Sequence, residues 1–436
     1  MKPNIIMIII DALRPKDLSL YGYSKETDKN IKQIAKESIT FKQNFAASNA
    51  SYNSLTAIFS GQYPTTNGFI HQMPRTEKEE FDKLRKNKFW LPLYLQKNRY
   101  TTISTTPQIL WFRKGFDFYV EEKVEGKRKF LSSYKLKRLL LKLPNWMYRL
   151  GKRLVKARAS PLFNSAEKVI DLSISKIEST NQPFFLFMHL LDTHCPYAAV
   201  KTKEIKSKNT IKKILKQIKT SSQKEYIKKR FFDCSANSLE QIKQKLDDSI
   251  ISVDKQIGKL SNYLKEKGLW ENTILIILSD HGDTLGEHKN YFCRGGLYDV
   301  SIHVPLIMHL PKTKPNIINQ LTSSIDIAPT ILDFINKEKI KADGKSLLPL
   351  IKTNKPIRNN IISVDGFCKD RTAIRTKNIK LIISNNPKCY LCGDDHTYNQ
   401  QDKKEEYDLE KDPEELNNIY KGKNKLEEFL ISSKHL

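Results

Sequence analysis

The chain has 436 residues, and 75 Lys and Arg against 48 Asp and Glu give it a formal net charge of +27. This charge favours an anionic substrate or partner, although no nucleic-acid recognition motif accompanies it and we expect no nucleic-acid binding. No run of about 18 apolar residues is present, which argues against a membrane-spanning helix. The apolar run Ile5–Ile10 is too short for a signal-peptide core, and six irregularly spaced cysteines do not resemble a disulfide framework. We therefore predict a cytoplasmic protein, with peripheral attachment to the inner face of the membrane as the alternative.

Short apolar runs rich in β-branched residues predict strands that are buried on both faces of a sheet. These runs are Asn4–Ile10, Phe184–Met188, Thr273–Leu278, Val304–Met308 and Ile361–Val364. Between them, apolar residues recur every three or four positions, most clearly from Leu239 to Leu264, and Gly268 follows as a helix C-cap. Strands that alternate with helices indicate a mostly parallel sheet with helices on both faces.

We expect this α/β fold over residues 1–350 and a small C-terminal α+β subdomain over residues 351–436. In the second part, the stretch 373–383 reads as strands of a small antiparallel sheet. No internal repeat is visible.

Two basic stretches interrupt the α/β pattern, near 120–160 and 200–230. Residues 127–158 carry twelve Lys and Arg and no acid, and residues 201–230 carry another twelve against only Glu204 and Glu225. We interpret both as insertions. A solvated basic surface is one interpretation, and a dock for a polyanion or an anionic membrane surface is the other.

Polar residues follow two of the predicted strands at their carboxyl ends, where ligands bind in sheets of this kind. Asp11 follows the first strand, and Asp280 and His281 follow the strand that ends at Leu278. Ser51 lies in a polar turn before an apolar helix. Carboxylates and an imidazole predict a site for a hard divalent cation such as Ca²⁺, Mg²⁺ or Mn²⁺. A hydroxyl beside that ion can act as a nucleophile.

The order of these motifs resembles the sulfatase family of the alkaline phosphatase superfamily over nearly the whole chain. The segments that carry the resemblance are IIIDALRPKDLSLYGY, Ser51 ten residues before Gly61, FFLFMHLLDTHCPY, ILIILSDHGDTLGEH, RGGLYDVSIHVPLIM, SSIDIAPTILDF and EEYDLEKDPEELNNI. The resemblance implies an alkaline phosphatase-like fold and hydrolysis of a sulfate ester.

The resemblance also implies roles for individual residues. It assigns Asp11, Asp280 and His281 to the metal, Ser51 to the nucleophile, Arg294 to substrate binding, His194 to the leaving oxygen as an acid, and His288 to the substrate or the support of the site. We interpret the remaining candidates as structural: His189, His303 and His309 as core or surface histidines, and Tyr298 and Asp299 as residues that hold the fold.

The sequence departs from the family pattern at several positions. Asn53 and Leu55 stand where the signature for conversion of the nucleophile to formylglycine has Pro and Arg, so we predict that Ser51 stays unmodified. Ala12 replaces the second aspartate of the opening pair, and the segment 104–107 replaces a Lys-x-His segment. We expect one divalent cation, Ca²⁺ first, with Mg²⁺, Mn²⁺ and Zn²⁺ as alternatives.

These departures keep other functions open. A phosphate or phosphonate ester hydrolase, or a phosphoethanolamine-type transferase, is the alternative within the superfamily. A non-catalytic anion-binding protein is the alternative from another class, and the joint presence of the Asp, Ser and His motifs argues against it. We expect an anionic ester substrate, a glycan or a lipid-linked glycan among the options, and leave the oligomeric state open. Cys389 and Cys392 with His396 are a weak zinc-binding pattern.

Overall fold

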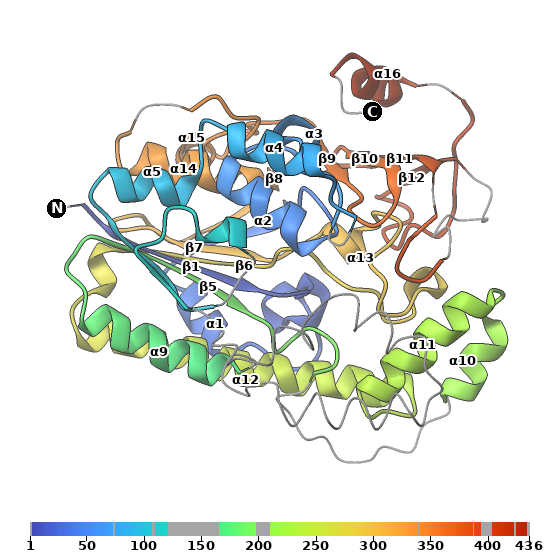
Figure 1. Cartoon of the computed structure of the whole chain (residues 1–436), viewed down its shortest axis with the longest axis horizontal. Coiled ribbons are helices and arrows are strands. Elements are labelled where there is room, and N and C mark those ends of the chain that lie inside the picture. The colour runs from blue at the N-terminus through green and yellow to red at the C-terminus, as the bar shows by residue number, and fades with distance from the viewer. Residues whose placement is uncertain are drawn as a thin grey trace.

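The computed structural model describes residues 2–72, 75–106, 110–120, 165–197, 210–337, 340–386, 388–393, 403–422 and 424–433. A large central sheet lies between two layers of helices, and a smaller sheet lies beside it toward the C-terminus (Figure 1). This confirms the predicted fold class. The basic stretch 127–158 lies outside the described residues.

The central sheet has eight strands in the order β4-β3-β5-β1-β6-β7-β2-β8. In chain order these are β1 (Asn4–Ile10), β2 (Ile39–Phe45), β3 (Thr101–Ser104), β4 (Phe118–Tyr119), β5 (Phe184–Leu190), β6 (Thr273–Leu278), β7 (Leu306–His309) and β8 (Asn316–Ser323). Only β7 runs against its two neighbours among these strands, while the other pairs are parallel. The predicted strands at 4–10 and 273–278 have the same bounds in the structure, and the other two begin or end within two residues of their predicted bounds.

Strand β1 is buried along its whole length because both faces of the sheet are covered. Ile6, Ile8 and Ile10 join a hydrophobic cluster with the helices of one layer, whereas Ile5 and Met7 join a second cluster with the helices of the other layer. This alternation with a period of two is why the strand reads as a continuous apolar run.

The helices that cover the first face are α1 (Lys29–Ala35), α9 (Ala166–Glu178) and α12 (Leu239–Glu266). The other face is covered by α2 (Ser51–Ser60), α5 (Leu91–Lys97), α14 (Ile327–Phe334) and α15 (Leu348–Thr353). The other α-helices among the described residues are α3 (Pro64–Asn67), α4 (Lys78–Lys86), α10 (Ile211–Gln217), α11 (Ser221–Asp233), α13 (Asp299–Ile302) and α16 (Lys425–Ser432). None of the described helices combines the length and the apolar composition that crossing a lipid bilayer requires.

The helix predicted from residue 239 is α12, which begins with the Ser238 side chain accepting a hydrogen bond from the Gln241 backbone N–H. Its apolar face enters the core as the spacing indicated. Asp254 in the same helix accepts the backbone N–H groups of Asn30 and Ile31 at 2.9 and 2.8 Å. A side chain of α12 therefore satisfies the free donors at the start of α1.

The second sheet has four antiparallel strands in the order β12-β11-β10-β9. They are β9 (Ile361–Val364), β10 (Lys369–Arg375), β11 (Ile379–Asn386) and β12 (Lys404–Asp408). The predicted antiparallel strands over 373–383 are the hairpin β10–β11, and the predicted strand 361–364 lies in this sheet. One part of this sheet packs against Phe45 and Leu321 at the edge of the central sheet.

Candidate active site

Three neighbouring parallel strands deliver the acidic and imidazole side chains of the site. Strand β1 lies between β5 and β6, so Asp11 after β1, His189 near the end of β5, and Asp280 and His281 after β6 meet at one edge of the sheet. Donor atoms of Asp11, His189 and Asp280 all lie within 4.8 Å of one another, and all three residues are buried. His281 Nε2 lies 3.4 Å from Asp280 Oδ2 and 3.8 Å from Asp11 Oδ1.

Two carboxylate oxygens of this cluster are left without hydrogen-bond donors. Asp11 Oδ1 and Asp280 Oδ2 are buried and accept no hydrogen bond from the described residues. Buried polar atoms are nearly always satisfied, so oxygens of this kind fit a site that an ion completes. Burial alone would raise the pKa of Asp11, but electrostatic interaction with the His194 ring and the contact with His189 outweigh it and hold that pKa well below its usual range.

The tautomer of His281 directs one ring nitrogen into the site. Its Nδ1 donates to the carbonyl of Gly282 at 2.8 Å, which leaves the Nε2 lone pair as an acceptor. Nε2 lies 3.0 Å from Ser51 Oγ and 2.7 Å from Arg294 Nη1. Burial and then the charge of Arg294 lower the pKa of His281 to about 4, so the ring is neutral at pH 7 and suited to bind a metal ion.

Ser51 is the first residue of α2, after Ala50 in an extended conformation. The two residues that depart from the formylglycine signature are built into the surrounding fold. Asn53 Nδ2 donates to the carbonyls of Phe69 and Ile70, and Leu55 is buried in the core beneath the helix. Asn53 and Leu55 therefore make contacts within the fold that the Pro and Arg of the signature would not make.

Arg294 connects the two histidines of the site. Its Nη1 contacts His281 and its Nη2 lies 2.6 Å from His194 Nε2, while His194 Nδ1 donates to the Cys195 carbonyl. The guanidinium also lies 5.5 Å from the centre of the Phe367 ring. The structure thus brings Ser51, His194 and Arg294 together with the carboxylates. The Arg294 guanidinium lies where it can contact an anionic group bound beside Ser51.

His189, interpreted from the sequence as a core or surface histidine, lies beside the two carboxylates in the structure. It is buried, as a core histidine would be, but its Nε2 also lies 3.2 Å from Asp11 Oδ2 and 3.7 Å from Asp280 Oδ2. Its backbone N–H donates to Thr106 Oγ1, within the segment that replaces Lys-x-His. The available signal was a polar residue interrupting an apolar strand one position before its end.

His288 lies in a different environment from the other candidates. Its ring stacks on Tyr298 with centroids 3.6 Å apart, and it lines a cavity of about 580 Å³ with Arg14, Glu287 and Asp299. Burial and then the charge of Lys380 lower its pKa to about 4. These contacts give His288 a place between the central sheet and the C-terminal sheet.

The remaining polar candidates make the structural contacts expected of them. His303 contacts the Lys42 carbonyl and His309 the Thr273 carbonyl. Tyr298 donates its hydroxyl hydrogen to Glu405, and Asp299 pairs with Arg375 and Lys380.

Comparison with known proteins identifies two matching family models. The model described as Sulfatase matches residues 3–337, and the model described as N-sulphoglucosamine sulphohydrolase, C-terminal, matches residues 286–432.

Among curated relatives, the chain is 33% identical over 186 residues to an N-acetylglucosamine-6-O-sulfatase of Bacteroides thetaiotaomicron, which covers 39% of this chain but only 31% of that relative. It is 24% identical over 455 residues to an arylsulfatase of Clostridium perfringens, covering 96% of this chain and 90% of the relative.

Two solved structures share the fold. One is a complex with D-glucosamine-2-N,6-O-disulfate, with a TM-score of 0.65, 21% identity and coverage of 100% of this chain and 96% of that one. The other is a phosphonate monoester hydrolase of Agrobacterium radiobacter, with a TM-score of 0.66, 17% identity and coverage of 100% and 94%.

Proposed function

The chain belongs to the sulfatase family of the alkaline phosphatase superfamily, and we propose that it hydrolyses sulfate esters with Ser51 as the nucleophile. The observation that carries this proposal is the convergence on Ser51 of two buried carboxylates, three histidines and one arginine. A divalent ion would be held by Asp11, Asp280 and His281, and we add His189 as a fourth ligand.

The donor set bears on the identity of the ion. Two carboxylates and two imidazoles suit Zn²⁺ or Mn²⁺, because Ca²⁺ prefers ligands made of oxygen alone. We therefore propose Zn²⁺ or Mn²⁺ in place of the Ca²⁺ expected from the sequence. When bound, such an ion stabilises the Ser51 alkoxide and the charge on the ester oxygens.

The protein side chains divide the remaining work. Ser51 Oγ attacks the sulfur in line with the leaving oxygen, and Arg294 stabilises the equatorial oxygens of the ester. Burial lowers the pKa of His194, which disfavours its imidazolium form. An ester anion against Arg294 and His194 favours the imidazolium, which is the form that can protonate the leaving oxygen.

A phosphate or phosphonate ester is the second candidate substrate. An unmodified serine forms a covalent ester that only a second in-line displacement by water can clear. Because Asn53 and Leu55 are committed to contacts of the fold, we propose that Ser51 remains serine. This chemistry serves phosphorus as well as sulfur. The names of the relatives favour a sulfated amino sugar as the first class of substrate to try.

The test is an ester panel assayed with the purified chain loaded separately with Zn²⁺, Mn²⁺ or Ca²⁺. We expect turnover of a sulfate ester, an unmodified Ser51 peptide by mass spectrometry, and loss of activity in Ser51→Ala. Ser54→Ala is the matched control, because the Ser54 hydroxyl lies in the same helix and donates to the Ser48 carbonyl. Full activity of Ser51→Ala would refute the assignment of the nucleophile, and turnover of phosphate esters alone would favour the second candidate.

A further inference from the structure

A second cluster of metal-binding side chains lies outside the site of Ser51. The Sγ atoms of Cys293, Cys389 and Cys392 all lie within 4.8 Å of one another, and all three residues are buried. Cys293 Sγ is 3.5 Å from Cys389 Sγ and 3.4 Å from Cys392 Sγ. Cys293 and the other two residues are almost one hundred positions apart in the chain, so the cluster is made by the tertiary fold.

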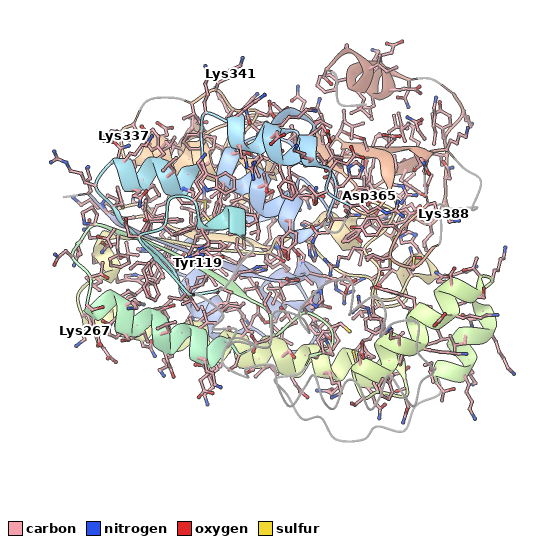
Figure 2. All side chains as sticks on the ribbon, in the orientation of Figure 1. Tyr119, Lys267, Lys337, Lys341, Asp365 and Lys388 are labelled. Atoms are coloured by element: carbon pink, nitrogen blue, oxygen red, sulfur yellow. The ribbon has the colours of Figure 1, made fainter. Side chains whose placement is uncertain are left out.

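A fourth thiol borders this cluster. Cys368 is buried and packs in the same cluster of residues as Cys293, Cys389 and Cys392. Arg371 Nη1 lies 3.3 Å from Cys368 Sγ and donates to it. A guanidinium at this place suits a thiolate more than a neutral thiol. Figure 2 labels Asp365 and Lys388, on the segments that carry Cys368 and Cys389, on the side of the molecule occupied by the C-terminal sheet.

The spacing of the sulfurs fits a tetrahedral ion. Zinc–sulfur bonds of about 2.3 Å place the ligand sulfurs of a tetrahedral site about 3.8 Å apart, whereas the sulfurs of a disulfide are about 2.0 Å apart. The separations from Cys293 are close to the first value. Among divalent ions, a set of four thiolates selects zinc or iron over the hard cations.

We propose that Cys293, Cys368, Cys389 and Cys392 bind one zinc ion as a structural site, separate from the ion beside Ser51. Binding converts four thiols and Zn²⁺ into a tetrathiolate complex and releases four protons. The complex carries two negative charges, which Arg371 and the nearby Arg294 offset. This proposal does not rest on the sulfatase function.

The site would join segments that position the catalytic residues. Cys293 precedes Arg294, and Phe367 lies between Cys368 and Gly366 beneath the Arg294 guanidinium. Asn49 connects the same two segments, because it accepts from the Gly366 N–H and donates to the Arg294 carbonyl. Ala50, next to Ser51, packs in the same cluster. A zinc ion here would therefore hold Arg294 and the start of α2 in one arrangement.

The experiment measures metal and thiols in the full chain. We expect the variant with both Asp11→Asn and Asp280→Asn, which lacks the ligands of the first ion, to retain about one zinc per chain. Cobalt in its place should give thiolate-to-metal charge-transfer absorption. The variant with both Cys389→Ser and Cys392→Ser should lose both signals. The matched control is the double change Cys195→Ser and Cys234→Ser, a buried pair with sulfurs 3.0 Å apart, which should keep them.

Two outcomes would overturn the proposal. One is a variant with both Asp11→Asn and Asp280→Asn that binds no zinc and shows no thiolate-to-metal charge transfer after reconstitution with cobalt. The other is a double variant Cys195→Ser and Cys234→Ser in which fewer than all four remaining cysteines react with a thiol reagent after unfolding in chelator, because a disulfide then occupies the cluster. If the cysteine variants fail to fold, the cobalt charge-transfer absorption of the wild type and of the aspartate variant still tests whether thiolates bind the metal. If the wild-type protein binds zinc at the cysteines but has no esterase activity, that result would refute the proposed function and leave the zinc site standing.

Discussion

Ala12 shows how a single residue supports the carboxylate cluster through its backbone. It stands where the family pattern has an aspartate, and its φ of +58° lies in the left-handed region that few residues other than glycine adopt. In this conformation its backbone N–H donates to Asp280 Oδ1 at 3.2 Å. A backbone donor therefore orients Asp280 at this position, and the His189 ring of β5 lies beside Asp11.

The first prediction concerns His189. Replacing it with Asn removes one of four proposed ligands, so we expect at least about tenfold weaker zinc or manganese binding and a parallel loss of activity. Equilibrium dialysis followed by elemental analysis measures the binding. His309→Gln is the control, since His309 is also a buried strand histidine but contacts the Thr273 carbonyl. Unchanged metal affinity in His189→Asn would show that this residue only packs the core.

The second prediction concerns His288, whose folded pKa of about 4 lies below the unfolded value of about 6.5. Between these values the unfolded chain binds a proton that the folded chain does not. Stability is therefore lost as the pH falls from 6.5 toward 4, by about 2 kcal/mol between pH 7 and pH 5.

Urea unfolding at the two pH values tests this against His288→Asn, since Asn tolerates the positive φ of this position. The variant should lack this part of the pH dependence. An identical slope in both proteins would contradict the burial of a neutral ring.

At the scale of elements, the start of α2 is held by the turn after β9. The Gly366 N–H donates to Asn49 and its carbonyl accepts from the Gln72 N–H. A Cβ built on Gly366 would lie 2.5 Å from the Ala50 Cβ and 3.0 Å from the Asn53 side-chain oxygen. Only glycine lets this turn approach the segment that presents Ser51.

The third prediction follows from that contact. Gly366→Ala should cost about 1–3 kcal/mol of stability through overpacking, and should lower activity by displacing Ser51. Adding Ala50→Gly removes the closest atom, so the double variant should recover part of both losses, which is a positive coupling between neighbouring sites. Thermal unfolding and esterase assays of the four proteins measure it. Strictly additive effects would mean that the turn and the helix start do not touch.

At the scale of the whole molecule, a buried ion cluster joins the central and C-terminal sheets. Lys380 of β11 donates to Asp299 at 2.8 Å and pairs with Glu415 at 2.6 Å, and Arg375 of β10 contacts Asp299 as well. Asp299 begins α13, a few residues after Arg294. The domain boundary at residue 350 remains a prediction. Because of these ion pairs, we expect the stability of the central sheet and of the C-terminal sheet to be linked.

The fourth prediction is that Lys380→Met costs about 3–5 kcal/mol, because it leaves the buried Glu415 carboxylate without its cationic partner. The exposed Lys377→Met on the same hairpin is the control and should change the free energy of unfolding by less than about 0.5 kcal/mol. Chemical denaturation measures both. Equal effects of the two substitutions would mean that the ion cluster contributes little to the contact between the sheets.

Much of the fold was readable from the sequence because buried strands need uninterrupted apolar runs. This requirement gave β1 and β6 their bounds, and the helical period gave α12. Asp11, Asp280 and His281 were readable for a related reason, since residues that follow parallel strands share one edge of the sheet. Within the second basic stretch, residues 210–230 form α10 and much of α11. The docking role of the two basic stretches stays a prediction.

Contacts between distant segments were decided only by the tertiary structure. His189 reaches Asp11 because β5 pairs with β1 in a register that sets His189 opposite Ile9. His288 is only six residues from Arg294, and its positive φ belongs to a turn that sets its ring against Tyr298. Local patterns encode which residues are strand or helix because periodicity depends on near neighbours. Strand order, register and turn direction depend on packing across the whole chain, and they determined which histidines and cysteines meet.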